Sequence, residues 1–330
     1  MSATVAAAQG AAWHRLLDAN LELPPEYADQ LTNHLPMALH ALAELGADDA
    51  RMQQFFKRYA RRFAGRVAEP AAAAAPDWPA LRGQPHAFAP LCGTFAAALA
   101  HEGRDAVLRA ALPALLPGVA AAAFHGAIRT AHAVQAGHDG ELAAALAYWA
   151  WRWQPLAAAP RGTPMPFDAW CERLIAAGEA CSFDGSLISQ RMAGAAHCAA
   201  YRELAGSLAP AIDVPDRLLA FAAQCYADTR NFTVLHLVTG LRALRVLLPW
   251  VPDGDAALRE VVPAFTAAYL SAAVRPAALP PIAVMAWSTI VQRAIASDDD
   301  HVIKLVHACH GAAKQELKGP FLAAASRAVA

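Results

Sequence analysis

The stretch AAFHGAIRTAHAVQAGHDGELAAALAYWAW, residues 122–151, decides the fold class of this chain. Its apolar residues recur three and four positions apart, which is the period of one helix face. Alanine, the residue with the highest helix propensity, fills many of the other positions. The text around this stretch predicts two helices, over residues 119–136 and 140–153.

The same alanine- and leucine-rich pattern extends in both directions, and alternating β-branched runs of strand length are almost absent. Further helices are expected over residues 3–20, 31–45, 48–67, 93–102, 105–111, 168–179, 187–204, 215–228, 233–248, 254–271, 281–297 and 300–318. We predict an all-α fold, either a multi-helix bundle or a stacked array of helical hairpins, with residues 1–330 forming a single domain. Residues 69–90 are rich in proline and alanine without helical periodicity, which predicts a linker or a loop that covers the active site.

Composition and charge exclude several classes of protein. The 27 basic and 28 acidic side chains nearly cancel, and no dense basic stripe marks a nucleic-acid partner. Residues 1–17 lack a positively charged start before an apolar run, and the apolar stretch 110–124 is too short to span a bilayer. We expect a cytoplasmic protein without stable membrane insertion. The six cysteines form no C-x-x-C pair, so no disulfide framework or zinc ribbon is indicated. The oligomeric state is left open.

The common catalytic motifs are also absent. The chain has no G-x-G-x-x-G, G-x-x-x-x-G-K-[ST], G-x-S-x-G or H-E-x-x-H, which argues against dinucleotide binding, NTPase, serine-hydrolase and zincin chemistry. A helical protein that performs redox chemistry without a dinucleotide fold usually depends on a metal or haem, and the covalent haem motif C-x-x-C-H is missing too.

The 13 histidines are about twice what average composition supplies in this length. Four lie in apolar helical text: His34, His125, His236 and His301. A buried imidazole has two nitrogens to satisfy, and binding a metal through one while donating from the other satisfies both. For any one of them a hydrogen bond to a carbonyl is the commoner state, but four such residues together favour a metal site built between helices.

Lys304 follows His301 by three residues and therefore lies on the same helix face, with Asp300 as the expected N-cap. In a desolvated, cation-rich site the pKa of a lysine falls, and the neutral amine can react with carbon dioxide to give a carbamate. The carbamate is an anionic oxygen ligand for a metal. The alternative is a surface lysine whose stem packs on the protein.

Other residues are weaker candidates. His132 lies seven residues after His125 and is placed to join the cluster or to bond one of its ligands, and Asn33 is placed to orient a ligand or to cap a helix. Four aromatic residues either line an apolar pocket for a flat substrate or pack in the core. They are Phe124, Trp149, Trp151 and Trp153. His307 and His310 fall away from the His301 face and are interpreted as ordinary residues of the last helix. The other six histidines show no convergent spacing and are interpreted as structural or exposed: His14, His40, His86, His101, His138 and His197.

Four segments, in order, resemble the questin oxidase-like family, which includes fungal enzymes of anthraquinone and aflatoxin-type pathways described as Baeyer–Villiger-type oxidases, and bacterial relatives. They are PPEYADQLTNHLPMALHALAELGA at 24–47, the stretch 122–151, NFTVLHLVTGLRALRVLLPW at 231–250 and DDDHVIKLVHAC at 298–309. Together they span most of the chain.

The resemblance implies an oxygen-dependent oxidoreductase in which histidines and a carboxylated lysine hold non-haem iron. The matching positions are His34, His125, His236, His301 and Lys304. Arg129 stands where some members have a second histidine, and the chain is shorter than typical fungal members, so its substrate walls differ. Fe(II) is the expected metal, although imidazole ligands also suit zinc and other divalent ions. NADPH, reported for the family, would need loose binding or a partner.

The implied substrates are dioxygen and an aromatic or quinone-like ring, and the reaction is either monooxygenase- or dioxygenase-type oxygen insertion or carbon–carbon cleavage. Two alternatives stay open from the residues themselves. One is a non-catalytic helical interaction module with individually satisfied histidines, and the other is a zinc hydrolase that uses the same ligands.

Overall fold

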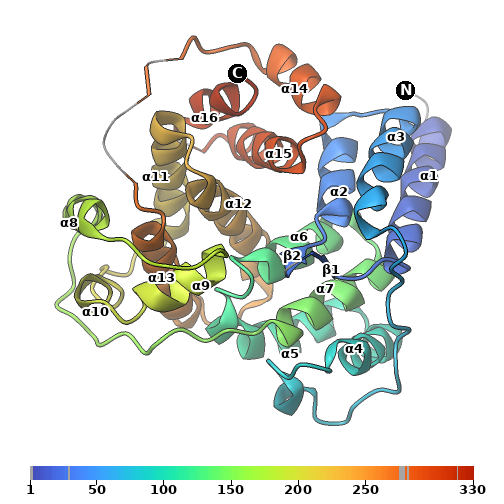
Figure 1. Ribbon diagram of the computed structural model, residues 1–330, viewed down its shortest axis with the longest axis horizontal. Helices are drawn as coiled ribbons and strands as arrows, with labels where there is room; N and C mark the ends of the chain where they lie inside the picture. The colour runs from blue at the N-terminus through green and yellow to red at the C-terminus, as the bar shows by residue number, and fades with distance from the viewer. Residues whose placement is uncertain (1–2, 29, 275–278, 281, 318) are drawn as a thin grey trace.

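The computed structural model describes residues 3–28, 30–274, 279–280, 282–317 and 319–330, with the backbone alone for residues 3–11. The all-α prediction is confirmed: sixteen α-helices accompany one two-stranded antiparallel sheet, β1 (Glu26–Tyr27) and β2 (Leu31–Thr32), in the described part of the chain. Figure 1 shows the helices arranged around a central group that includes α2, α6, α12 and α15.

The helix bounds, with four short 3₁₀-helices (η), are α1 (Ala3–Leu21), α2 (Leu35–Leu45), α3 (Asp49–Ala60), η1 (Arg61–Phe63), η2 (Trp78–Leu81), α4 (Phe88–Glu102), α5 (Arg104–Leu115), η3 (Leu116–Gly118), α6 (His125–Ala136), α7 (Asp139–Trp151), α8 (Phe167–Ala180), α9 (Ile188–Ala195), α10 (Ala199–Leu204), α11 (Val214–Thr229), α12 (Phe232–Leu247), η4 (Leu248–Trp250), α13 (Gly254–Ser271), α14 (Trp287–Ala296), α15 (Asp300–Lys314) and α16 (Phe321–Ala328).

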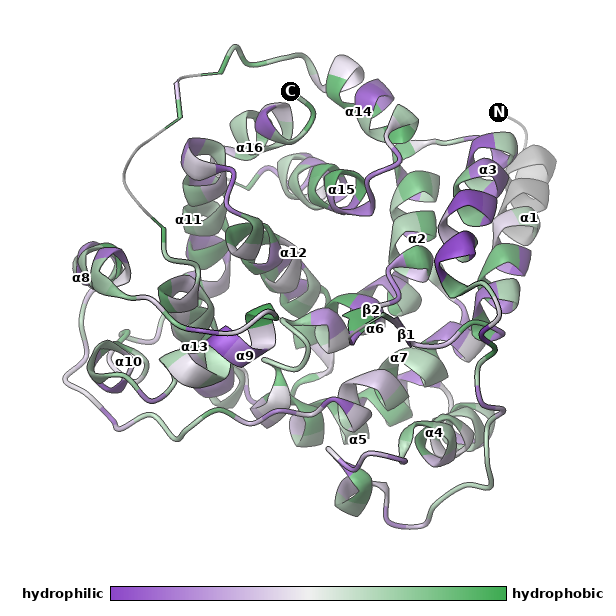
Figure 2. Cartoon of the chain, viewed as in Figure 1, coloured by the Kyte–Doolittle hydropathy of each residue, from purple (hydrophilic) through white to green (hydrophobic). Residues whose placement is uncertain are grey.

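Four helices form the centre of the fold. α2 packs against α6 and α15, and α12 packs against the same two, so the four close into a ring. Most of their residues are buried, and Figure 2 shows α2 and α12 largely in the apolar colour while the outer helix α3 carries polar residues. Burial therefore extends round much of each helix, as is usual for helices surrounded by protein.

These four helices run in the same direction. His34, His125, His236 and His301, at or near their N-terminal ends, have neighbouring rings. Residues at or near their C-terminal ends line one common cavity: Glu44, Gln135, Arg245 and Gln315. Parallel neighbours cannot be joined by short turns, so the intervening helices return the chain. The parallel arrangement of the four central helices thus explains why outer helices lie between them in the sequence.

The observed helix ends differ from the predicted ones where the backbone has a special conformation. The helix predicted over 31–45 begins only at Leu35, because residues 31–32 pair as β2. The helix predicted over 119–136 begins at His125, since Ala122, Ala123 and Phe124 have positive φ and cannot continue a right-handed helix.

Other differences concern helix number. The helix predicted over 187–204 is two helices, α9 and α10, and α16 was not predicted at all. The predicted helix 281–297 starts on a residue outside the described ones, and the observed α14 begins at Trp287. The predicted helix 300–318 likewise ends on a residue outside the description, and α15 ends at Lys314.

The proline- and alanine-rich segment 69–90 packs onto the helices beneath it. The rings of Trp78 and Phe95 lie 5.0 Å apart, and the Gly83 amide donates to Ala150 O at 2.9 Å. Gly93 lies so close to the segment that an added Cβ would stand 1.9 Å from Ala72 O. Glycine is therefore required where this segment crosses α4.

Residues Phe232–Trp250 form the one described helix that is long and apolar enough to cross a membrane, with a mean hydropathy of 1.4. In the structure 72% of this window is buried inside the protein. Its apolar surface is accounted for by its place in the central ring.

Candidate metal centre

Four histidine rings form a closed circuit where the N-terminal ends of the central helices meet. The ring centroids of His34 and His125 lie 4.5 Å apart, and those of His125 and His236 lie 5.0 Å apart. The circuit closes through His301, whose ring centroid lies 5.5 Å from His236 and 4.8 Å from His34. The structure thus brings together the four histidines that the sequence singled out.

Backbone carbonyls fix the protonation of two of these rings. His236 Nδ1 lies 2.8 Å from Phe232 O, and His125 Nδ1 contacts Ala122 O. A carbonyl only accepts, so each Nδ1 carries the proton and each Nε2 keeps its lone pair. The His125 Nε2 atom is buried and has no partner among the described residues. Both rings are therefore held as metal ligands usually are.

A carboxylate performs the same task for His34. Its Nδ1 lies 2.5 Å from Asp300 Oδ2, and its Nε2 is buried without a described partner. His301 Nδ1 lies 3.3 Å from the same Asp300 oxygen, and its Nε2 is also unpartnered within the described chain. His34, Asp300 and His301 each offer a ligand atom within 4.8 Å of the others. Asp300 is a site residue that the sequence interpretation missed.

The predicted N-cap of this helix was wrong by one residue. Asp299 caps α15 by accepting from the His301 amide at 2.8 Å, which releases Asp300 to face inward. Asp300 is buried, and its second oxygen lies 3.4 Å from Arg62 Nη1. Burial acts to raise the pKa of Asp300, but His34, His301 and Lys304 together outweigh it and hold this pKa well below its usual range.

Burial keeps the imidazoles of His34, His125 and His236 neutral, which is the form that binds metal. It lowers the pKa of His34 to about 3, with the Lys304 ammonium adding to the effect and Asp300 opposing it. Burial also lowers the pKa values of His125 and His236 well below the ordinary value, helped by neighbouring rings and Lys304. Unprotonated ligands are thus present at neutral pH without a metal to displace their protons.

Lys304 is buried beside this cluster. Its Nζ lies 3.8 Å from Asp300 Oδ2, one helical turn away on α15. Burial lowers the pKa of Lys304 to about 8, although Asp300 opposes the shift. A substantial share of the amine is therefore neutral at mildly alkaline pH. Lys304 is not among the residues that line the adjoining cavity.

Local sequence explains how the ligands are placed. Asn33 accepts from the Leu35 amide at 3.0 Å and donates to Asn20 Oδ1 at 3.0 Å, which anchors the start of α2 beside His34. Asn231 caps α12 by accepting from the amides of residues 233 and 234. The Asn33 side chain therefore acts on the helix start, one of the two roles the sequence allowed.

A left-handed turn places His125. The three residues before it have positive φ, and Phe124 turns its ring against α12 at Gly240. A Cβ on Gly240 would stand 2.9 Å from the Phe124 side chain, so only glycine accommodates this contact. The turn is a costly conformation for non-glycine residues, which is typical of functional sites.

The histidine circuit opens into a cavity of about 470 Å³. All four histidines line it, together with the aromatic residues Tyr27, Trp151, Trp153 and Phe232 and the cations Arg152 and Arg191. Two of the four predicted aromatic residues, Trp151 and Trp153, thus reach the cavity. Trp149 is instead fully buried with its Nε1 donating to Gly118 O at 3.1 Å, and Phe124 packs in the core.

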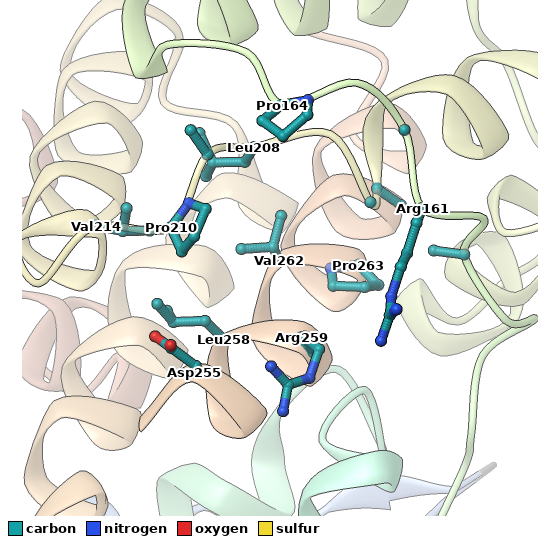
Figure 3. Close-up of a pocket in the computed structure, with 15 residues that line it drawn as sticks. Arg161, Pro164, Leu208, Pro210, Val214, Asp255, Leu258, Arg259, Val262 and Pro263 are labelled. Atoms are coloured by element: carbon teal, nitrogen blue, oxygen red, sulfur yellow. The ribbon is translucent and has the colours of Figure 1, made fainter. Parts of the chain in front are cut away.

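Figure 3 shows a second cavity, of about 400 Å³, where Arg161, Leu208 and Arg259 lie around an apolar floor that includes Val262. None of its lining residues is a histidine or cysteine, and it shares no lining residue with the histidine cavity. The larger, histidine-lined cavity is therefore the better candidate for chemistry.

Comparison with known families agrees with this geometry. Residues 31–173 match the family model described as Questin oxidase-like. This part of the chain, less than half of its length, is similar to the questin oxidase-like family. The resemblance read from the sequence is confirmed there, and the family implies an oxidoreductase, an oxidase of an aromatic substrate. No curated protein matches the chain. The match includes His34 and His125, while His236, His301 and Lys304 lie beyond it.

Within the questin oxidase-like segment, Arg129 is not part of the metal centre. Its guanidinium donates to both carboxylate oxygens of Glu141, at 2.5 and 2.9 Å, and both side chains are buried between α6 and α7. His132, the other weaker candidate on α6, lies next to His40 and His307 rather than next to His125. The sequence pattern showed no convergent spacing for His40 and placed His307 away from the His301 face, yet the structure brings both together with His132 in one cluster.

Proposed function

We propose that this questin oxidase-like protein is a non-haem iron oxygenase that oxidises an aromatic, quinone-like substrate with dioxygen. The observation that carries the proposal is the set of buried, unpartnered Nε2 atoms on His34, His125 and His301 at the wall of one large cavity. Buried polar atoms are normally satisfied, so such a set points to a ligand that the protein itself does not supply.

The donor set fits a transition metal. Neutral imidazoles with Nδ1 anchored to carbonyl or carboxylate oxygens are the usual form of histidine ligands, and they suit iron. His34, His125, His236 and His301 would hold the ion, and Asp300 would orient two of them. Bound ferrous iron would supply the one-electron and dioxygen chemistry that amino acid side chains lack.

Lys304 would add an anionic oxygen. Its neutral amine attacks carbon dioxide: a nitrogen–carbon bond forms, one C=O π bond opens to give a carboxylate, and one amine proton is released to water, so that a carbamate replaces the amine. Lys304 is buried near His34, His125 and His236, and this burial favours the neutral amine that the reaction needs. A carbamate would also place a negative charge beside a divalent cation, where it is stabilised.

The cavity suits a flat, electron-rich substrate. Trp151, Trp153 and Phe232 offer aromatic faces, and the Phe232 ring lies 4.7 Å from the His301 ring, next to the proposed metal. Arg191 and the N-terminal ends of the four central helices supply positive potential, which favours a phenolate over a neutral phenol. The side chains would thus orient the ring and exclude water, and the metal would do the oxidation.

The test is metal content followed by oxygen use. Protein purified without oxygen and reconstituted with ferrous iron is analysed by elemental mass spectrometry, as wild type and as the His125→Ala and His236→Ala variants. We expect nearly one iron per chain in the wild type and a loss in both variants. Iron-loaded protein is then screened with phenols and quinones for dioxygen uptake and ¹⁸O incorporation, which separates oxygen insertion from ring cleavage.

Two outcomes would contradict the proposal. If the wild type holds no iron after reconstitution, the metal site is refuted. If it holds zinc tightly and consumes no dioxygen with any aromatic compound, the same ligands serve a hydrolytic site. His101→Ala, at an exposed position outside the cavity, is the matched control and should retain wild-type iron.

A further inference from the structure

A second cluster of three histidines lies deeper in the central ring of helices. His40 from α2 and His132 from α6 face each other with their Nδ1 atoms 2.8 Å apart. The His307 ring, from α15, lies 5.4 Å from His40 and 5.3 Å from His132 between centroids. All three side chains are buried, and each offers a nitrogen within 4.8 Å of the others.

The second cluster repeats the first one along the same helices. His40, His132 and His307 follow His34, His125 and His301 by six or seven residues on α2, α6 and α15. At 1.5 Å per residue the two layers are about 9–10.5 Å apart along the helices. Because α2, α6 and α15 are parallel, the repeat within each of these three helices becomes a second layer of histidines.

The protein does not satisfy the nitrogens of this layer. His40 Nε2 and His307 Nδ1 are buried without a partner among the described residues. Only one proton can lie between the two facing Nδ1 atoms of His40 and His132, so one of these nitrogens offers a lone pair. Burial, assisted by the charge of Arg242, lowers the pKa of His40 to about 3, so the ring stays neutral. Three neutral, converging imidazoles are a donor set for a transition metal.

We propose that His40, His132 and His307 form a second transition-metal site, independent of the proposed iron centre. The ion takes the place of the proton between His40 Nδ1 and His132 Nδ1, and that proton moves to the Nε2 of the ring that carried it, so both rings stay neutral. The site is reached through a cavity of about 340 Å³ at the C-terminal ends of the central helices. His307 and Arg242 line this cavity, whereas the iron centre opens at the opposite ends of the same helices. Each site therefore has its own entrance.

Arg242 occupies the place of a fourth ligand. It follows His236 by six residues on α12, and its Nη2 lies 3.4 Å from His307 Nε2 while also donating to Gln135. The contact to His307 is longer than a good hydrogen bond, so a metal can take this nitrogen at little cost. The guanidinium charge repels a cation, so the second site binds a divalent ion less tightly than it would without Arg242.

The test uses the full chain, stripped of metal by a chelator and titrated with Co²⁺ under calorimetric and optical detection. We expect two Co²⁺ per wild-type chain. In His40→Gln and in His307→Gln, the affinity for one of the two Co²⁺ ions should fall at least about tenfold, and the affinity for the other should be unchanged. His310→Gln is the matched control, because His310 lines the same cavity on α15 but is not in the cluster.

Arg242→Gln makes the test independent of whether a histidine variant folds. Loss of the guanidinium charge should tighten the second equivalent severalfold. Weaker Co²⁺ binding in Arg242→Gln, or protection of the wild type by phosphate, would show an anion site and overturn the proposal. A wild type that binds no more Co²⁺ than His40→Gln also overturns it. If only the proposed iron centre does not exist, the wild type binds a single Co²⁺. This Co²⁺ is still bound by His236→Ala and is lost in His40→Gln.

Discussion

His34 Nδ1 and Asp300 Oδ2 lie 2.5 Å apart, although 266 residues separate them in the chain. The contact joins the start of α2 to the start of α15. Asp300 fixes the orientation of the His34 ring and is itself the neighbour in sequence of His301, a second proposed ligand. Asp300 also lies 3.8 Å from the Lys304 amine, so a single buried carboxylate connects three of the five proposed metal-binding side chains.

The first prediction concerns this carboxylate. Asp300→Asn keeps the shape but removes the charge that holds His34 in place, so we expect iron affinity to fall about 10–100-fold. The measurement is competition against a chelator of known affinity. The control is Asp298→Asn, which disrupts only ion pairs near the surface with Arg51 and Arg58 and should leave iron affinity unchanged. Equal affinity in both variants would contradict the assigned role.

The sequence was sufficient to select the four histidines that the structure brings together, because each lies on or near a predicted helix with small or apolar neighbours, where an unpaired imidazole is costly. It did not reveal Asp300, because in a run of three aspartates at a helix start each residue is an equally good cap. Only the structure shows that Asp299 caps the helix and Asp300 faces inward.

The second histidine layer was missed for a different reason. Periodicity shows which residues share a face of one helix, but it does not give the relative direction of helices distant in the chain. His40 and His307 meet only because α2 and α15 are parallel neighbours. The signal in the sequence was the repeated spacing of six or seven residues between histidines in three of the matching segments.

The second prediction concerns Phe232, which is 54% exposed although its ring contacts those of His236 and His301. An exposed aromatic ring beside the metal suggests a substrate contact. Phe232→Ala should raise KM about tenfold, equivalent to about 1.4 kcal/mol of lost apolar contact, with iron content unchanged. The control, Ile212→Ala, removes an exposed apolar side chain outside the cavity. An unchanged KM would place the substrate elsewhere.

The third prediction is acid sensitivity of the metal-free protein. The pKa of His40 is about 3 in the folded chain and near 6.5 when the chain is unfolded. Between these two pH values the unfolded state binds the proton and the native state does not. The contribution of His40 to the free energy of unfolding is therefore fully present above pH 6.5 and is lost as the pH is lowered. Each such histidine contributes at most about 1.4 kcal/mol per pH unit.

Urea titrations at several pH values between 5 and 7.5, with chelator present, test this sensitivity. His40→Gln removes one titrating group, so its free energy of unfolding should depend less steeply on pH than that of the wild type, whatever its absolute value. His101→Gln, at an exposed position, should keep the wild-type slope. Identical slopes for wild type and His40→Gln would show that His40 does not stay neutral in the folded protein.

The fourth prediction tests how closely α6 and α7 must pack to place His125. A Cβ at Gly126 would stand 2.6 Å from Trp149 Cγ and 2.9 Å from its Cα, so Gly126→Ala must separate the helices. We expect a loss of about 1–3 kcal/mol in the free energy of unfolding and weaker iron binding, because His125 moves with the helix. Gly311→Ala is the opposite case. Gly311 lies inside α15 with no described atom within 4 Å of an added Cβ, so alanine should stabilise the protein by about 0.5–1 kcal/mol. If Gly126→Ala were as stable as the wild type and held iron equally well, the contact between α6 and Trp149 would not determine the position of His125.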